Sequence, residues 1–162
     1  MIDFSNFQII VDTREQHPWE FSKMEKTIAK LDTGDYSLKG LEDVFCIERK
    51  GSVSEFANNI TEKRFKDVIE RLSNVQHSFL LFEFNLEDIL QYPVGSTVPK
   101  RMWSKLRISP KFILKHVNEL QLLHNVKVLF CGDAEKAEKI ALALMRKAYE
   151  LYGQPTKTDT DI

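Results

Sequence analysis

The chain has 162 residues, of which 43% are apolar, and 23 lysines and arginines nearly balance 24 acidic residues. This length predicts one domain with a sizeable core, and the net charge of −1 excludes a simple polycation, so that any nucleic-acid surface must be a local patch. No apolar run reaches the roughly 20 residues of a membrane span, no signal peptide is visible, and Cys46 and Cys131 lack metal-ligand spacing. We therefore expect a soluble intracellular protein with reduced thiols and no membrane partner, cytoplasmic in a prokaryote or phage and nuclear in a eukaryote.

The first fifty residues predict three strands. FQIIVD (7–12) is a short β-branched run, and TREQHPW follows as a loop because Pro18 cannot continue a helix. TIAKLDT (27–33) alternates until Gly34, and VFCIERK (44–50) forms the third strand. Strands that follow one another this closely favour an antiparallel meander.

The rest of the chain alternates helices with strands. The expected elements are helices over 52–60 and 61–74, a strand over 78–84, a short helical piece after it, a helix from Ser109–Pro110, a strand over 126–131, and a last helix from Asp133 to about Tyr152. The order β-β-β-α-α-β-α-β-α predicts an α/β fold with a mixed central β-sheet flanked by helices. Residues 153–162 are polar and are predicted to form a C-terminal tail.

Acidic residues lie at the ends of the N-terminal strands. Asp12 ends the first strand, Asp35 follows the second, and Glu48 precedes Lys50 at the end of the third. Clustered carboxylates repel one another and are costly to bury unpaired, but Mg²⁺ prefers oxygen ligands and takes one or two carboxylates. The pattern predicts a magnesium site at Asp35 and Glu48, with Asp12 as a third candidate ligand, that activates water and neutralises charge on a phosphate.

The spacing of the third strand assigns a direction to each charged side chain. Residues 48 and 50 face the same side of a strand, so the Lys50 ammonium and the Glu48 carboxylate point into one site. The Arg49 side chain points away, while its backbone carbonyl is expected near the metal. The alternative is a strand end with solvated charges, together with an ordinary Gly-Asp turn.

VDTREQ (11–16), LDTGDYSL (31–38) and IERK (47–50) resemble, in order and spacing, the three signature segments of the XPF-type nuclease domain. The resemblance covers roughly residues 7–150. It implies that residues 1–152 form such a domain, with a restriction-endonuclease-like core of the PD-(D/E)xK class. It also implies cleavage of branched DNA, such as flaps and forks, with Mg²⁺ or Mn²⁺.

The resemblance further implies roles for individual residues. Those implied at the catalytic site are the metal ligands Asp35 and Glu48, the catalytic lysine Lys50, and the lining residues Asp12, Arg14 and Glu15. On the following helix, Arg64 and Arg71 match the family's helix beside the site and are expected to reach a DNA phosphate; the alternative is a solvated helix face.

Two departures from the family pattern bear on function. Ser54 stands where the family has an aspartate after E-R-K, which weakens the expected ligand set, and the neighbouring Glu55 is expected to point elsewhere as the capping partner of Ser52. Family members often carry a helix-hairpin-helix tandem after the nuclease domain, and no such module is expected in this sequence. We therefore expect the contacts that bind DNA to come from this domain, from a nuclease partner subunit, or from a second copy in a homodimer.

One segment is clearly basic, because no acid occurs between Asp88 and Glu119. Its charged residues and the tryptophan among them are Lys100, Arg101, Trp103, Lys105, Arg107, Lys111 and Lys115. Such a patch supplies sequence-independent affinity for phosphates, and an exposed tryptophan can stack on an unpaired base. The alternative is a tryptophan packed on the core within a solvated surface.

The sequence thus supports a metal-dependent DNA endonuclease with little sequence preference, of a kind used in DNA repair or recombination. The alternative is a non-catalytic DNA-binding or scaffold subunit that partners another nuclease. Ser54 favours this second hypothesis, whereas the intact Asp35, Glu48 and Lys50 argue against it. A replication- or recombination-associated nuclease of a phage or mobile element is a third possibility.

Overall fold

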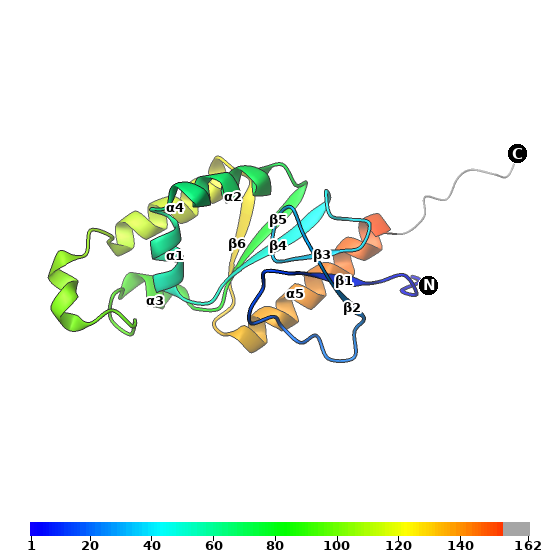
Figure 1. Cartoon of the computed structure of the whole chain (residues 1–162), viewed down its shortest axis with the longest axis horizontal. Helices are drawn as coiled ribbons and strands as arrows, with labels where there is room; N and C mark the ends of the chain where they lie inside the picture. Colours follow the sequence, from blue (N-terminus) through cyan, green and yellow to red (C-terminus); the bar gives the residue numbers. More distant parts are fainter. Residues whose placement is uncertain (154–162) are drawn as a thin grey trace, which may run out of the picture.

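The computed structural model describes residues 1–153, and it consists of a mixed β-sheet with helices on both faces (Figure 1). The strands are β1 (Ile9–Asp12), β2 (Lys26–Ala29), β3 (Tyr36–Leu38), β4 (Phe45–Lys50), β5 (His77–Phe82) and β6 (Val126–Phe130). Among the described residues they form one six-stranded sheet in the order β2-β1-β3-β4-β5-β6. The pairs β1–β2, β4–β5 and β5–β6 are parallel, while β3 runs antiparallel to both β1 and β4. The predicted α/β class with a mixed sheet is confirmed.

Three of the helices begin at the caps that the sequence predicted. The helices of the described chain are α1 (Val53–Asn59), α2 (Lys63–Ser73), α3 (Leu86–Leu90), the 3₁₀ helix η1 (Lys100–Lys105), α4 (Pro110–Leu122), α5 (Ala134–Ala148) and the π-helical turn η2 (Tyr149–Gly153). The side chains of Ser52, Ser109 and Asp133 each accept a backbone N–H from the first turn of α1, α4 and α5. Within residues 1–153, none of these helices has the length and apolar character needed to cross a membrane.

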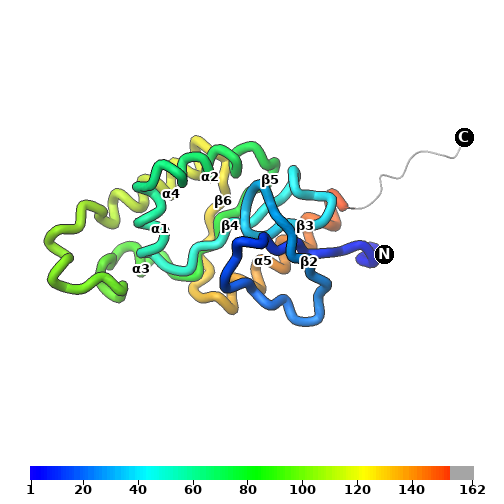
Figure 2. Tube along the Cα trace, viewed as in Figure 1, coloured from blue at the N-terminus to red at the C-terminus, as the bar shows by residue number. Residues whose placement is uncertain are grey.

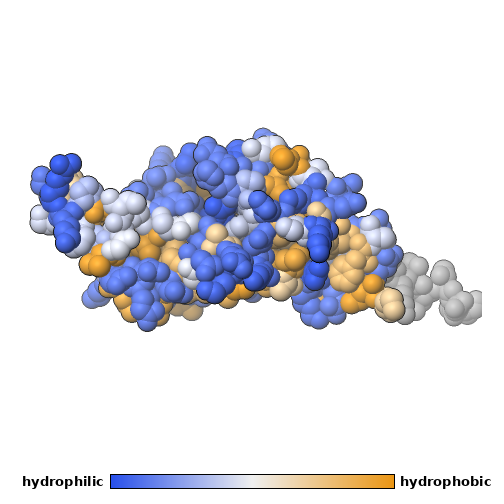
Figure 3. All heavy atoms as spheres, turned by 90° about the horizontal axis from the view of Figure 1, so that it is seen from below, coloured by the Kyte–Doolittle hydropathy of each residue, from blue (hydrophilic) through white to orange (hydrophobic). Residues whose placement is uncertain are grey.

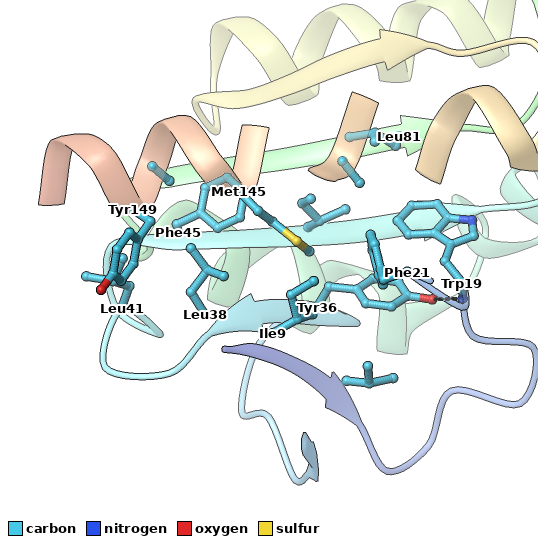
Figure 4. Close-up of a cluster of buried hydrophobic side chains, with 14 of the residues drawn as sticks. Ile9, Trp19, Phe21, Tyr36, Leu38, Leu41, Phe45, Leu81, Met145 and Tyr149 are labelled. Atoms are coloured by element: carbon cyan, nitrogen blue, oxygen red, sulfur yellow. Dashed lines mark hydrogen bonds between the residues drawn. The ribbon is translucent and has the colours of Figure 1, made fainter. Parts of the chain in front are cut away.

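The sheet separates two hydrophobic clusters, because side chains alternate along its strands. On one face, α1, α2 and α4 cover Cys46 of β4 together with Leu80 and Phe82 of β5. On the other face, α5 packs through Ala137, Ala141, Met145 and Ala148, which are spaced three to four residues apart, against the face that carries Tyr36 and Phe45 (Figure 4). Figure 2 shows the same division, with α5 on one side of the sheet and α2 and α4 on the other. Residues 46, 48 and 50 of β4 therefore face α1 and α2.

The predicted second strand is wrong in both extent and direction. It ends at Ala29 rather than at residue 33, and a separate strand, β3, begins at Tyr36. β2 pairs parallel with β1, with Ile9 opposite Lys26, so these two strands are no antiparallel hairpin. The connecting segment 13–25 has about the dozen residues that a parallel crossover needs. The expected tail begins at residue 153, which belongs to η2, and the rest of it lies outside the described residues.

Gly34 allows the turn before β3 to pass close to β4. Its φ of +81° lies in the left-handed region, and a Cβ there would lie 3.0 Å from the carbonyl oxygen of Ile47 and 3.1 Å from the Cβ of Cys46. Gly40 has a similar φ of +84°, but a Cβ at that position would meet no atom within 4 Å. The glycine of the Gly-Asp pair is therefore needed for both conformation and space.

We expect Gly34→Ala to cost more stability than Gly40→Ala. Both substitutions pay the left-handed penalty of about 1–2 kcal/mol, and only Gly34→Ala adds a clash with β4. Urea denaturation of both variants measures the difference, with Gly40→Ala as the matched control. Equal losses of unfolding free energy would show that the close approach at residue 34 is unimportant.

Candidate active site

Three strands bring the motif residues to one edge of the sheet. β1 ends at Asp12 and β4 ends at Lys50, and the antiparallel strand between them starts beside Asp35 at the same edge. The backbone N–H of Asp12 donates to the carbonyl of Asp35 (2.9 Å), and the N–H of Asp35 donates to the carbonyl of Ile47 (2.8 Å). These two backbone hydrogen bonds fix Asp35 between β1 and β4 without any contribution from its side chain.

The side chains of Asp35, Glu48 and Lys50 meet on the face that carries α1 and α2. Asp35 Oδ2 accepts the backbone N–H of Arg49 at 2.8 Å. Lys50 Nζ lies 3.4 Å from Glu48 Oε1, as the strand spacing predicted, and 5.5 Å from the centre of the Phe65 ring in α2. Lys50 is only 8% exposed, so its ammonium is held by these neighbours rather than by water.

The Asp12 carboxylate is buried and already hydrogen-bonded. It is 3% exposed; Oδ1 accepts the N–H of Leu31 at 2.8 Å, and Oδ2 accepts Arg14 Nε at 2.7 Å. These bonds hold the segment after β2 and the start of the loop after β1. Its role as a metal ligand stays a prediction, and residues 1–153 contain no group of three or more His, Cys, Asp or Glu side chains arranged to hold a metal.

Burial opposes ionisation of the two remaining carboxyl groups. Burial, and then the charge of Glu48, raise the pKa of Asp35 well above its ordinary value, against the Arg49 N–H that lowers it. Burial also raises the pKa of Glu48, and the nearby Lys50 ammonium lowers it in part. Glu15 adds a further negative charge that raises both pKa values. Two carboxylates that resist ionisation in the absence of a cation favour a cation beside them.

We expect Asp35→Asn to stabilise the metal-free protein. Because the pKa of Asp35 is raised in the folded state, its contribution to stability is full below about pH 4 and is lost as the pH rises through the folded pKa. Asparagine avoids this loss and still accepts the Arg49 N–H. In EDTA, the Tm of Asp35→Asn should therefore exceed that of the wild type at neutral pH, and each kcal/mol of added stability raises Tm by about 2–4 °C at this chain length.

The same melting experiment has an internal control. The difference in Tm should shrink towards acid pH, where the wild-type carboxyl is protonated. A lower Tm for Asp35→Asn at neutral pH would contradict the inferred electrostatic strain.

A cavity of about 440 Å³ opens over these groups. Its lining includes seven of the residues predicted from the sequence, namely Asp12, Arg14, Asp35, Glu48, Lys50, Arg64 and Arg71. The Arg64 and Arg14 side chains are 84% and 64% exposed, and Arg14 is held in place by its bonds to Asp12 and to the Leu31 carbonyl. The cavity therefore combines an acidic floor with basic groups from the first loop and from α2.

Arg49 and Glu15 lie on the other face of β4. The Arg49 guanidinium donates from Nε to Glu83 Oε1 at 2.7 Å and lies 3.5 Å from Glu15 Oε1. The sequence predicted that this side chain points away from the site, but it did not identify Glu83. Glu83 could have been found from its position, because it directly follows the apolar strand β5, just as other acids follow the neighbouring strands.

Ser54 and Glu55 differ from expectation in where they point. Ser54 lines a separate cavity of about 180 Å³ between α1 and α3, so the serine removes no group from the carboxylate cavity. Glu55 was expected to point elsewhere, but its Oε2 accepts the N–H of Gly51 at 2.9 Å and its Oε1 lies 3.8 Å from Lys50 Nζ. The Glu55 backbone N–H donates to the Ser52 hydroxyl, as expected of a capped helix, and the Glu55 side chain reaches back to Lys50.

The basic segment is not brought to the carboxylate cavity. η1 lies in the projection between α3 and α4, at the end of the molecule away from the N-terminus (Figure 1), and Figure 3 shows a strip of strongly hydrophilic atoms at the tip of that end, beside paler and apolar residues. Of the predicted DNA-binding residues from 100 to 107, none lines this cavity. The Trp103 indole N–H donates to the Val98 carbonyl at 2.9 Å, and Lys100 Nζ lies 6.0 Å from the ring centre. The ring belongs to neither hydrophobic cluster of the described chain.

Residues 11–143 match the ERCC4 domain model, and the chain belongs to this family. Among solved structures it is similar to XPF from Aeropyrum pernix and to the same protein in complex with DNA. In both comparisons the identity is 21% and the TM-score 0.61, and the matches cover 89% and 95% of this chain but 64% and 68% of the other chains. No curated protein sequence matches. The predicted resemblance to the XPF-type nuclease domain, and its fold, are confirmed.

Proposed function

We propose that the chain is a metal-dependent DNA endonuclease that hydrolyses phosphodiester bonds in branched or flap DNA with little sequence preference. The observation that carries the proposal is the placement of Asp35 and Glu48 beside the buried Lys50 in one cavity with arginines at its rim. Membership of the ERCC4 domain family supports the same reaction class. The XPF structure with bound DNA supports DNA as the ligand of this fold.

The residues fit Mg²⁺ or Mn²⁺ as the cofactor. The donors are carboxylate oxygens, Mg²⁺ needs only one or two of them because it keeps several waters, and Asp35 and Glu48 are the two whose pKa values are raised by burial. When bound, the ion would supply positive charge that polarises the phosphate and activates a water. Asp12 serves this site by fixing the surrounding backbone through its two hydrogen-bonded oxygens.

Each basic group has a separate task in this proposal. Lys50 is held next to Glu48 and offers its ammonium to the negative charge that develops on the phosphate. Arg14, Arg64 and Arg71 contact the phosphates on either side of the scissile bond, since they line the same cavity from two elements. None of these contacts reads a base, so specificity comes from the shape of the DNA.

The basic projection around η1 is a second contact for a long substrate. We expect the triple substitution of Lys100, Arg101 and Lys105 by Glu to weaken DNA binding and to flatten its salt dependence, by about one unit of slope for each phosphate that is no longer neutralised. Fluorescence anisotropy with labelled fork DNA between about 50 and 200 mM salt measures this. The same triple change to Gln removes the same positive charges without adding negative ones, so it should flatten the slope by a similar amount with a smaller loss of affinity. Unchanged affinity and slope in the Glu variant would show that the projection does not contact DNA.

A cleavage assay on flap, fork and plain duplex DNA tests the proposed function. We expect cleavage of flap and fork DNA in Mg²⁺ or Mn²⁺ and none in EDTA. Binding without cleavage in any metal would favour the alternative, a non-catalytic scaffold subunit. That alternative relied on Ser54, which lines the other cavity. An intracellular location, a role in repair or recombination, and a homodimer or partner subunit belong to the same proposal.

A further inference from the structure

A buried ion pair lies behind the carboxylate site, on the α5 face of the sheet. Glu83 follows β5, and its side chain is only 6% exposed. Its Oε1 accepts Arg49 Nε at 2.7 Å, and its Oε2 accepts the Trp19 indole N–H at 3.1 Å. Both oxygens are therefore held, and Glu83 lines none of the cavity over Asp35 and Glu48. Burial of a carboxylate is costly without such partners.

Arg49 connects this ion pair to the catalytic carboxylates through its own backbone. Its N–H donates to Asp35 Oδ2 at 2.8 Å on one side of the strand. On the other side, its guanidinium contacts Glu83, Glu15 and the carbonyl of His17, and lies 5.7 Å from the centre of the Trp19 ring. The residue that orients the Asp35 oxygen is thus anchored by its side chain on the opposite face.

The same contacts also tie down the loop after β1. The Trp19 ring stacks on the Tyr36 ring with 4.6 Å between their centroids, and the Tyr36 hydroxyl accepts the backbone N–H of Trp19 at 2.9 Å (Figure 4). A second acid, Glu138 of α5, holds this loop by accepting the backbone N–H of Phe21, whereas the ion pairs of Arg49 within the described chain are with Glu83 and Glu15. Glu83 and Glu138 therefore both hold the loop after β1, and of these two only Glu83 also pairs with Arg49 of β4.

We propose that Glu83 is a positioning residue for the carboxylate site. By pairing with Arg49 it fixes the end of β4, and so it sets the N–H that orients the side chain of Asp35. The inference rests on the proposed metal-dependent hydrolysis, and outer partners of this kind typically change metal affinity or activity by roughly 10- to 100-fold when they are replaced.

The test uses the full chain with Glu83→Gln and, as a matched control, Glu138→Gln. We expect Glu83→Gln to raise the Mg²⁺ concentration at half-maximal cleavage by roughly 10- to 100-fold and to leave the KM for DNA unchanged. Glu138→Gln should leave both values unchanged. Similar effects of the two substitutions would show that Glu83 acts only on the loop, and no change in Glu83→Gln would overturn the proposal.

A second measurement needs no catalytic activity. In the metal-free protein, ¹⁵N–¹H spectra should show that Glu83→Gln shifts the backbone amide of Arg49 and accelerates its hydrogen exchange, whereas Glu138→Gln does not. A shift confined to the Trp19 indole signal would contradict the coupling to Arg49. If the wild type cleaves no DNA, the proposed function fails, but this amide signal still decides whether Glu83 positions the strand.

Discussion

Substitution of Glu48 by Gln, or of Asp35 by Asn, is expected to lower the rate of DNA cleavage by roughly 10²- to 10⁴-fold. A bound cation supplies several kcal/mol of transition-state stabilisation, and each 1.4 kcal/mol corresponds to about a tenfold change in rate. Either substitution keeps the shape of the side chain and removes one of the two anionic groups on the cavity floor. Single-turnover cleavage of fork DNA in Mg²⁺ measures the loss.

Glu62 provides the control for that experiment. It lines the same cavity, but its side chain is 44% exposed and lies 4.0 Å from Arg64, so it has no part in the carboxylate floor. Glu62→Gln should change the rate by only a few-fold. Comparable losses in all three variants would mean that the overall negative charge of the cavity matters, and not a defined metal site.

Lys50→Met is expected to lower the cleavage rate by roughly 10²- to 10³-fold, the usual cost of removing one donor to a developing oxyanion. Methionine keeps an unbranched stem against Phe65 but removes the ammonium 3.4 Å from Glu48. Since that ammonium lowers the pKa of Glu48, its loss raises the pKa further. The acid limb of the pH–rate profile should therefore move to higher pH, and the profile measured from pH 5 to pH 9 shows both effects.

A lysine elsewhere in the sheet serves as the control for this change. Lys127 of β6 lies 5.2 Å from the centre of the Phe79 ring, in a similar contact with an aromatic side chain but outside the carboxylate cavity. Lys127→Met should keep the wild-type rate and profile. A Lys50→Met enzyme with normal rate would exclude the lysine from the reaction.

Local signals in the sequence predicted most of the elements correctly. The helix caps at Ser52, Ser109 and Asp133 depend on contacts within a single turn, so they were visible in the sequence. The Glu48–Lys50 pairing followed from strand alternation alone. The fold class followed from the order of the elements, because later strands alternate with helices.

Most of the differences concern contacts between segments that are distant in sequence. The parallel pairing of β2 with β1 depends on the path of residues 13–25, which no local pattern encodes. Glu83 is recognisable as a site neighbour only once β5 lies beside β4 and places it next to Arg49. Glu55 satisfies its cap and also turns towards Lys50, which spacing alone did not show.

Anomalous diffraction from crystals soaked in Mn²⁺ tests the proposed metal site most directly. A strong peak between the carboxylates of Asp35 and Glu48, and its loss in Asp35→Asn crystals, is the result that we expect. Well-ordered crystals with no peak at these carboxylates, or with a peak only elsewhere on the chain, would contradict a metal-dependent nuclease centre at this edge of the sheet.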